Sequence, residues 1–259
     1  MPSHKTQSKN LLLLDMGNTR VKWALSVAGE LCEFGATETA EFTLQHCLRG
    51  MEGIQIDGIV CCCVAAQSMI DSLNDDALEL LKLTPIIAIV ESERGGVLNQ
   101  YKNLSQLGVD RWIAMLGAAR ANLDNQVIVV DAGTAVTIDL LSAKREFVGG
   151  VIFPGAELLS QSLNQHTARI SAERTSTNTV FGTSTDECVS AGVRFGSASA
   201  VKGIIEQMLI ESPTHTDVLL CGGGAQALVE LMQGFEHSLV DSIKVDKDLI
   251  FKGLIALSQ

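Results

Sequence analysis

Apolar residues along the chain follow three patterns, namely short continuous runs, alternation with a period of two, and a period near 3.6. The first two patterns predict strands, and the third predicts amphipathic helices. The segments predicted as strands are residues 11–16, 20–27, 30–36, 57–64, 85–90, 127–131, 135–141, 147–152, 218–221 and 238–245. The segments predicted as helices are residues 41–50, 69–82, 110–121, 155–165, 186–209 and 248–257. A loop rich in Gly, Asn and Ser is expected over residues 91–108.

The order of these elements occurs twice. Each half opens with a strand, a turn that begins Asp-x-Gly, a return strand and a third strand, and then continues with helices and further strands. The two turns begin at Asp15 and Asp131. This weak repeat predicts two similar α/β domains with a ligand-binding cleft between them. We expect a disordered extension over residues 1–10, an N-terminal domain over residues 11–113 and a C-terminal domain over residues 114–259.

The net charge of the chain disfavours some classes of binding partner. Lys and Arg total 19 and Asp and Glu total 30, so the net charge is −11. An acidic surface repels nucleic-acid phosphates and anionic lipids, so we expect neither nucleic acid nor a membrane as a partner. No apolar run approaches the roughly 18 residues of a membrane-spanning helix. Because residues 1–10 are also polar and unlike a signal peptide, we expect a cytoplasmic protein.

The cysteines indicate a reducing compartment. There are seven, an odd number, and none forms a Cys-x-x-Cys pair. Three of them, Cys61, Cys62 and Cys63, are adjacent in an apolar run. We therefore expect buried, free cysteines and neither a disulfide framework nor a zinc site.

The first turn has residues suited to binding a phosphate group. Successive N–H groups of Gly17, Asn18 and Thr19 could form an anion-binding nest, and Lys22 could add a compact positive charge. Asp15, at the end of the strand, is a candidate Mg²⁺ ligand through water. The alternative is a Gly-Asn hairpin turn in which the aspartate has no such role.

The second turn repeats the design without a lysine. Its sequence, Asp131-x-Gly133-Thr134-Ala135, offers a carboxylate, a glycine and a hydroxyl in the same order as the first turn. Two turns of this kind could clamp the β- and γ-phosphates of a nucleotide. Asp131 supplies a hard oxygen ligand, so a cation site is plausible there.

An acid and a base are adjacent at the start of the predicted helix 110–121. A carboxylate at Asp110 could take a proton from a substrate hydroxyl, and a guanidinium at Arg111 could bind a carboxylate or phosphate through two hydrogen bonds. The alternative is a helix cap followed by a surface ion pair. Tyr101, the single tyrosine, is either a core aromatic residue or part of a small-molecule pocket.

Two further segments have both a structural and a functional interpretation. Ser184-x-x-Glu187 fits a capping box, which would leave Thr185 able to present its hydroxyl and amide to a ligand. Gly222-Gly223-Gly224 follows a predicted strand and would allow either the approach of an adenine or ribose or a tight strand-to-helix turn.

Several motifs in one order resemble those of type III pantothenate kinases of the bacterial coenzyme A pathway. The resemblance extends over residues 11–257. The motifs that carry it are Asp15-Met16-Gly17-Asn18-Thr19-x-x-Lys22, Tyr101-Lys102-Asn103, Gly108-Val109-Asp110-Arg111, Asp131-x-Gly133-Thr134-Ala135-x-Thr137-x-Asp139, Gly149-Gly150-x-Ile152-x-Pro154-Gly155, Thr185 and residues 248–254.

The resemblance implies two ribonuclease-H-like domains of the actin-like ATPase type, and a homodimer. It implies phosphorylation of pantothenate by ATP with Mg²⁺ and a K⁺ or NH₄⁺ ion. By the same resemblance, Asp110 is the general base, and Asp131 binds the monovalent cation. The expected ATP and phosphate contacts are Asp15, Met16, Gly17, Asn18, Thr19, Arg20, Val21, Lys22 and Thr134. The expected pantothenate contacts are Tyr101, Gly108, Val109, Asp110, Arg111 and, from across the dimer interface, Thr185.

Two other functions fit the same scaffold. A regulatory or accessory factor would be favoured by loss of Asp15, Asp110 or Arg111, and all three are present. Another small-molecule kinase of the superfamily would act on a sugar or on acetate. Tyr101 together with the Gly108–Arg111 motif favours pantothenate.

Overall fold

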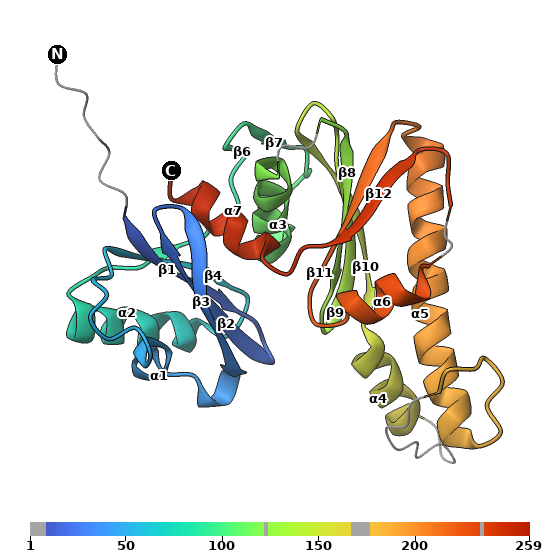
Figure 1. Ribbon diagram of the computed structural model, residues 1–259, viewed down its shortest axis with the longest axis horizontal. Helices are drawn as coiled ribbons and strands as arrows, with labels where there is room; N and C mark the ends of the chain where they lie inside the picture. The colour runs from blue at the N-terminus through green and yellow to red at the C-terminus, as the bar shows by residue number, and fades with distance from the viewer. Residues whose placement is uncertain (1–8, 122–123, 167–176, 234–235) are drawn as a thin grey trace. The chain divides into compact units, whose positions relative to one another are not determined.

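The computed structural model describes residues 9–121, 124–166, 177–233 and 236–259, which pack into two compact units (Figure 1). The first unit contains Met1–Ala121 and Asp248–Gln259, and the second contains Asn122–Lys247. Of the expected disordered extension, residues 1–8 lie outside the described residues. Asn10 already belongs to the first strand.

The first unit is built on a mixed sheet with the strand order β3-β2-β1-β4-β5. Strand β1 is antiparallel to β2 and parallel to β4. Alternate β1 residues such as Leu12 and Leu14 enter a core with α1 and α2, while α3 and α7 pack on β1 and β4. The elements are β1 (Asn10–Met16), β2 (Arg20–Val27), β3 (Glu30–Glu38), η1 (Thr39–Glu41), α1 (Leu44–Leu48), β4 (Gly58–Cys63), α2 (Gln67–Leu81), β5 (Ile86–Ile87), β6 (Glu93–Arg94), β7 (Val97–Asn99), η2 (Leu104–Gln106), α3 (Val109–Arg120) and α7 (Leu249–Leu257).

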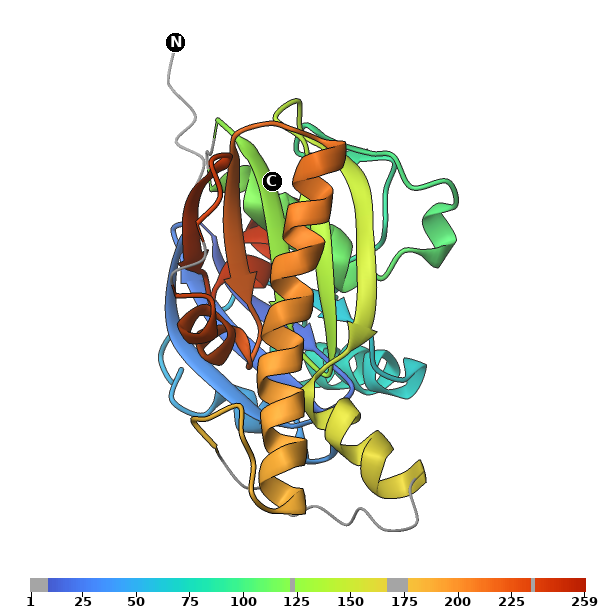
Figure 2. The same cartoon turned by 90° about the vertical axis from the view of Figure 1, so that its right-hand side faces the viewer.

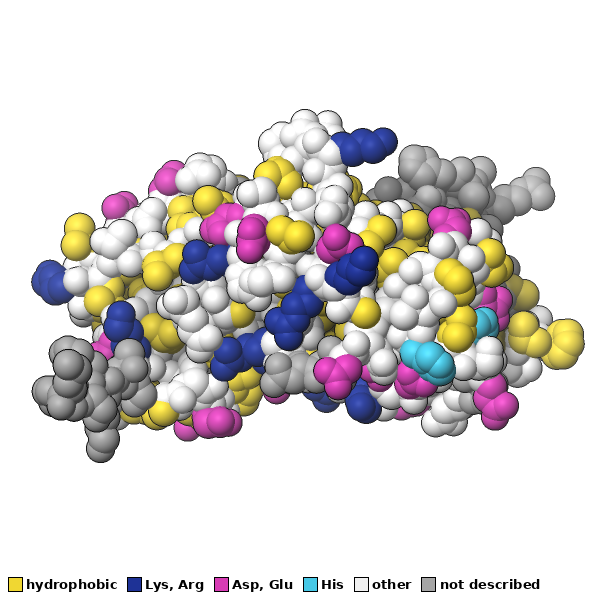
Figure 3. Space-filling view, turned by 90° about the horizontal axis from the view of Figure 1, so that it is seen from above, with side chains coloured by type: hydrophobic (Ala, Val, Ile, Leu, Met, Phe, Trp, Pro, Cys, Tyr) yellow, Lys and Arg dark blue, Asp and Glu magenta, His cyan; other side chains and the backbone are white. Residues whose placement is uncertain are grey.

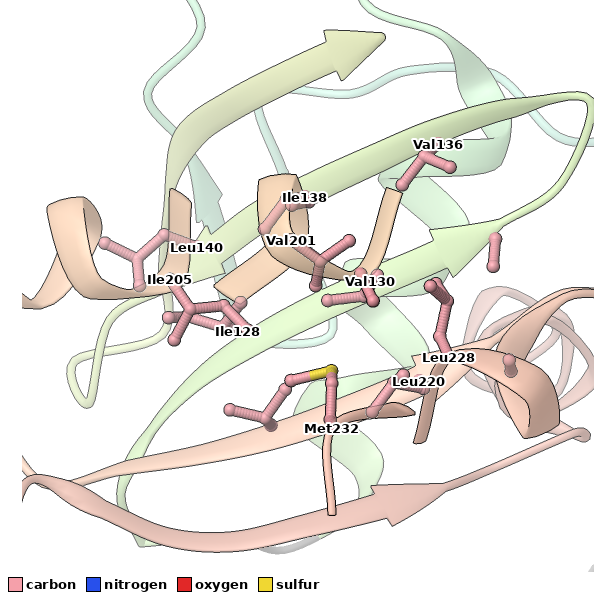
Figure 4. Close-up of a cluster of buried hydrophobic side chains, with 14 of the residues drawn as sticks. Ile128, Val130, Val136, Ile138, Leu140, Val201, Ile205, Leu220, Leu228 and Met232 are labelled. Carbon is pink, nitrogen blue, oxygen red and sulfur yellow. The ribbon is translucent and has the colours of Figure 1, made fainter. Parts of the chain in front are cut away.

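The second unit repeats this arrangement. Its five strands run in the order β10-β9-β8-β11-β12, with β8 antiparallel to β9 and parallel to β11. Helix α5 lies over the sheet (Figure 2), and Val201 and Ile205 of α5 meet Ile128 and Ile138 of the strands (Figure 4). The elements are β8 (Gln126–Ala132), β9 (Ala135–Leu141), β10 (Glu146–Pro154), α4 (Ala156–His166), α5 (Thr185–Glu211), β11 (Thr216–Cys221), α6 (Ala225–Leu231) and β12 (Val240–Val245).

The matching strand orders confirm the internal repeat predicted from the sequence. The boundary between the compact units differs from the expected division at residues 113 and 114, which falls inside α3. Packing keeps all of α3 in the first unit and also returns α7 to it from the C-terminal end of the chain. The physical reason is that α3 and α7 pack directly against each other.

Two glycines allow this close packing of α3 and α7. A Cβ on Gly117 would lie 2.1 Å from the carbonyl oxygen of Leu249, and one on Gly253 would lie 2.0 Å from that of Ile113. Both positions meet backbone, which cannot move aside as a side-chain end can. The separation of the two helices therefore depends on the absence of side chains at these positions.

Several local predictions need correction. The expected helix over residues 41–50 is only Leu44–Leu48, because the Thr43 hydroxyl accepts a hydrogen bond from the His46 amide and caps the helix there. The expected strand over residues 85–90 is only Ile86–Ile87, paired with β4 alone at the sheet edge. The expected loop contains the β6–β7 hairpin.

The structure also shows the environment of the cysteines and the distribution of charge on one face. All seven cysteines are free as expected, but Cys188 is exposed and Cys32 and Cys63 are only partly buried. No helix within the described residues is both long and apolar enough to span a membrane. Acidic and basic side chains share the face seen in Figure 3.

Replacement of Gly253 by alanine should destabilise the protein. Overpacking against the Ile113 carbonyl is expected to cost about 1–3 kcal/mol of unfolding free energy, in spite of the better helix propensity of alanine. Chemical denaturation would measure this. Gly203→Ala is the matched control, because a Cβ on this glycine of α5 has no neighbour within 4 Å. Equal stability of the two variants would contradict the predicted helix contact.

Candidate functional site

The β1–β2 turn places an acid and a base side by side. Asp15 pairs with Lys22 across the two strands, and Lys22 Nζ lies 4.0 Å from Asp15 Oδ2. The Gly17 amide donates to the Arg20 carbonyl at 3.0 Å and closes the turn. Neither Gly17 nor Asn18 has a positive φ. Glycine is favoured at position 17 because a Cβ would approach the Arg20 carbonyl oxygen to 3.0 Å.

The residues expected to bind phosphate differ in their exposure. Asn18, Thr19 and Arg20 are exposed at the tip of the turn. Met16 and Val21 are fully buried in the core of the first unit. These two residues can therefore contribute to a ligand site only through their backbone.

Thr39 holds this turn from the end of the neighbouring strand, and the sequence analysis did not identify it. Its hydroxyl donates to the Gly17 carbonyl at 2.8 Å, and its amide donates to the Thr19 carbonyl at 3.0 Å. No motif spacing marks this residue, because only the β2–β3 pairing brings it to the turn.

The Asp15 carboxyl lies in an environment that disfavours its charge. Its parallel partner on β4 is Cys62, a fully buried residue. Burial raises the pKa of Asp15 from 3.8 to about 6, Lys22 opposes this shift, and the charge of Asp110 adds to it. Asp15 and Asp110 therefore interact electrostatically although they are far apart in the sequence.

Asp110 lies in the first turn of α3, two residues after the helix cap Gly108. Its Oδ1 accepts a hydrogen bond from the Arg111 amide at 2.8 Å. A Cβ on Gly108 would lie 2.5 Å from the same Oδ1. The carboxylate thus folds back over the start of the helix, into space that is available only because residue 108 is glycine.

Arg111 and Tyr101 form a pair. Arg111 is only 5% exposed, so the alternative interpretation as a surface ion pair is wrong. Its Nη1 donates to the Tyr101 hydroxyl at 3.3 Å, and its guanidinium carbon lies 5.6 Å from the centre of the ring. A buried guanidinium fixed by an aromatic ring is suited to planar recognition of a carboxylate.

Two asparagines, to which the sequence analysis assigned no role of their own, shape the loop that carries Tyr101. Asn99 Oδ1 accepts from the Tyr101 amide at 3.1 Å, and Asn99 Nδ2 donates to the Glu91 carbonyl at 3.1 Å. Asn103 Oδ1 accepts from the Ser105 amide at 3.1 Å and caps η2. Asn before a turn is the signal that could have identified them.

In the second unit, glycine-rich segments surround Asp131 and its turn. The Gly133 amide donates to the Ala135 carbonyl at 3.0 Å, as Gly17 does within the first turn. This turn is one residue shorter, because Ala132 pairs with Val136 whereas Met16 pairs with Val21.

Two other glycine segments close around the same turn. The Gly155 amide donates to the Thr134 carbonyl at 2.9 Å, and the Gly224 amide donates to the Ala132 carbonyl at 2.9 Å. Gly222 has a φ of +84°, and a Cβ there would lie 2.3 Å from Asp131 Oδ1. Gly222-Gly223-Gly224 is the tight strand-to-helix turn that leads from β11 into α6.

The turn after Asp131 contains oxygen atoms of the kind that hard cations prefer, from one carboxylate and from backbone carbonyls. A Cβ on Gly155 would lie within 2.6 Å of the carbonyl oxygens of Gly133 and Thr134, so these backbone oxygens gather where a side chain is absent. Among the described residues, no group of three or more His, Cys, Asp or Glu side chains could hold a metal ion. Backbone carbonyls with one carboxylate suit a monovalent ion such as K⁺.

The start of α5 carries half of the predicted capping box. Ser184 Oγ accepts from the Glu187 amide at 3.3 Å. The Glu187 carboxylate accepts instead from the Thr183 amide and hydroxyl, at 2.7 and 2.8 Å, and these bonds lower its pKa. Thr185 is the first residue of the helix and is exposed.

Comparison with known proteins gives one consistent family. The sequence profile described as type III pantothenate kinase matches residues 11–207. The type III pantothenate kinase of Halorhodospira halophila is 36% identical over 224 residues, covering 84% of this chain and 88% of that protein.

Solved structures resemble the fold. A Campylobacter jejuni protein, provisionally described as a Baf family transcriptional activator, aligns with a TM-score of 0.57 and 22% identity over 95% of this chain and 98% of its own. A ROK family glucokinase from Streptomyces griseus aligns with a TM-score of 0.54 and 10% identity, over 95% and 97%. With the two mixed sheets, these likenesses show the actin-like, ribonuclease-H-like α/β fold.

Asp15→Asn should stabilise the protein near neutral pH. A pKa of about 6 in the folded state and 3.8 in the unfolded state means that ionisation of Asp15 opposes folding. The variant should exceed the wild type by up to about 3 kcal/mol above pH 6.5, and this advantage should shrink to nothing as the pH falls below about 4. Denaturation without nucleotide or divalent metal at several pH values measures it. A difference that does not depend on pH would contradict the assigned environment.

Proposed function

Because the chain belongs to the type III pantothenate kinase family, we propose that it transfers the γ-phosphate of ATP to the primary hydroxyl of pantothenate, the first step of coenzyme A biosynthesis. The strongest support is a set of interacting side chains within the first unit. They are the Asp15–Lys22 pair, the carboxylate of Asp110, which adds to the pKa shift of Asp15, and the buried Arg111–Tyr101 pair.

Asp110 is the general base of the proposed reaction. Phosphoryl transfer depends mainly on positioning and on charge neutralisation, so a carboxylate of modest basicity is sufficient to accept the hydroxyl proton. The close approach of Gly108 and the hydrogen bond from the Arg111 amide restrict the orientation of this carboxylate. It is therefore held in place before the substrate arrives.

Pantothenate carries a carboxylate at the end opposite to its reacting hydroxyl. Arg111 binds this carboxylate in our proposal, with Tyr101 beside it and the backbone of Gly108 and Val109 completing the pocket. The support is the burial of the guanidinium, which strengthens its attraction for an anion and keeps its geometry fixed. Thr185 contributes from a second copy of the chain.

In our proposal, the turn of the first unit binds the phosphates of ATP, and Thr134 remains an expected contact of the nucleotide. Within residues 15–22, the tip of the turn supplies backbone amides, and Lys22 supplies a positive charge. Mg²⁺, when bound, neutralises charge on the phosphates, and Asp15 would hold it through water. Asp131 would hold a K⁺ or NH₄⁺ ion, together with nearby backbone carbonyl oxygens.

The proposed compartment is the cytoplasm, where both substrates of the reaction are available. The seven free cysteines support this, because thiols stay reduced there.

A homodimer is proposed through one face of α5 and the segment before it. Val180 and Phe181 are 58% and 81% exposed. They border a groove of about 490 Å³ lined on α5 by small residues at helical spacing, namely Cys188, Ala191, Gly192, Gly196 and Ser199, and by Phe195. An apolar side chain presented beside a small-residue groove is self-complementary, as a twofold interface requires.

Pantothenate-dependent release of ADP tests the reaction. Purified protein with ATP, Mg²⁺ and pantothenate should turn over in K⁺ and much less in Na⁺, and Asp110→Asn should lower kcat at least about 100-fold. Asp75→Asn, an exposed acid on α2, is the control. Turnover with a sugar or acetate instead would indicate another kinase, and no turnover with any acceptor or cation would favour a regulatory protein.

Phe181→Ser should weaken the dimer. Loss of this exposed ring is expected to shift the protein toward monomer in sedimentation measured over a range of protein concentrations, and to raise KM for pantothenate, because Thr185 would no longer reach the partner's site. Leu78→Ser removes a side chain that is 60% exposed on α2, and should leave the assembly unchanged. A wild-type protein that is monomeric throughout would refute the proposed interface.

A further inference from the structure

Thr39 lies immediately after the edge strand β3 and makes two hydrogen bonds to the β1–β2 turn. The hydroxyl binds the Gly17 carbonyl at 2.8 Å, and the amide binds the Thr19 carbonyl at 3.0 Å. Thr39 is itself held, because its own carbonyl accepts from the amide of Phe42, the residue that follows η1. One residue outside the turn thus fixes two of the turn's carbonyl groups.

Fixing a carbonyl also fixes the amide that shares its peptide plane. In a trans peptide, the C=O of one residue and the N–H of the next point in opposite directions. When Thr39 holds the Gly17 carbonyl, the Asn18 N–H is directed away from Thr39. When it holds the Thr19 carbonyl, the same follows for the N–H of Arg20. Both residues are exposed at the tip of the turn.

The orientation of these amides matters because the Gly17 amide is already used. It donates to the Arg20 carbonyl, so it closes the turn and does not serve a ligand. A phosphate at this turn must therefore rely on later amides. It would also be repelled by any carbonyl oxygen that rotated toward it.

We propose that Thr39 is a positioning residue for the nucleotide phosphates, which acts by holding the Gly17 and Thr19 carbonyls away from them and directing the Asn18 and Arg20 amides toward them. This inference rests on the proposed function, because it requires that the turn binds phosphate. It adds a residue outside every motif identified from the sequence.

The two bonds of Thr39 can be separated by mutation. Thr39→Val keeps the backbone bond to Thr19 and the shape of the side chain, and removes only the hydroxyl bond to Gly17. The Gly17 amide bond that closes the hairpin also remains. The expected consequence is a less fixed Asn18 amide in a folded hairpin. Thr39→Ser restores the hydroxyl and should restore the function.

The experiment compares Thr39→Val, Thr39→Ser and the control Thr37→Val, a half-buried threonine two residues earlier on β3. Readouts are KM for ATP, KM for pantothenate, kcat, and the Kd of ADP by calorimetry. Thr39→Val should raise KM for ATP and Kd for ADP about fivefold to tenfold, the net worth of one hydrogen bond. In Thr39→Val, KM for pantothenate should stay within about twofold of the wild-type value. Thr39→Ser and Thr37→Val should stay within about twofold of the wild type in all four readouts.

Three results would overturn the inference. They are an unchanged ADP affinity in Thr39→Val, an equal rise of KM for both substrates, and failure of Thr39→Ser to restore ADP binding. A wild type that binds ADP but does not phosphorylate pantothenate would refute the proposed function alone, since calorimetry would still test Thr39. A wild type that binds no ADP would refute both.

Discussion

The close contact between α3 and α7 is the constraint on which the first unit depends. Gly117 and Gly253 let the two backbones touch, and α7 at the same time packs on β1 and β4. The height of α3 over the sheet is thereby set by backbone contact rather than by adaptable side chains. Because Asp110 and Arg111 lie in the first turn of α3, this contact also sets their position relative to Asp15 on β1. A segment from the end of the chain thus determines the geometry of a site near its beginning.

The two units share the same arrangement of strands and of the turn that follows the first strand. In each, an aspartate is the second-to-last residue of the unit's first strand (β1 or β8), and a glycine amide closes the turn that follows. The units differ in what surrounds that turn. Lys22 and Thr39 supply a cation and hydrogen-bond donors to the first, whereas Gly155 and Gly222 bring backbone close to Asp131 in the second. The repeat therefore keeps the same scaffold, while the groups that surround the turn differ between the two units.

Much of the fold could be predicted because the order of apolar and polar residues within each segment indicates its secondary structure. Continuous apolar runs followed by alternating apolar residues identified both hairpins, and the Asp-x-Gly turns at Asp15 and Asp131 identified the repeat. What failed depends on contacts between distant segments. No periodicity shows that α7 belongs with α3, and no spacing connects Thr39 to Gly17. The burial of Arg111 was equally hidden, because an Asp-Arg pair at a helix start looks the same in sequence whether it faces solvent or Tyr101.

The environment of Asp15 lowers the stability of the folded protein when this carboxyl group is ionised. The pKa of Asp15 rises to about 6 although Lys22 lies beside it. Burial of the carboxyl group therefore outweighs the attraction of Lys22. A protein selected for stability alone would not keep a carboxylate beside buried Cys62 and within the field of Asp110. Such groups persist where a ligand supplies the missing compensation. A divalent cation at Asp15 would do so, because its charge would stabilise the carboxylate form that burial disfavours.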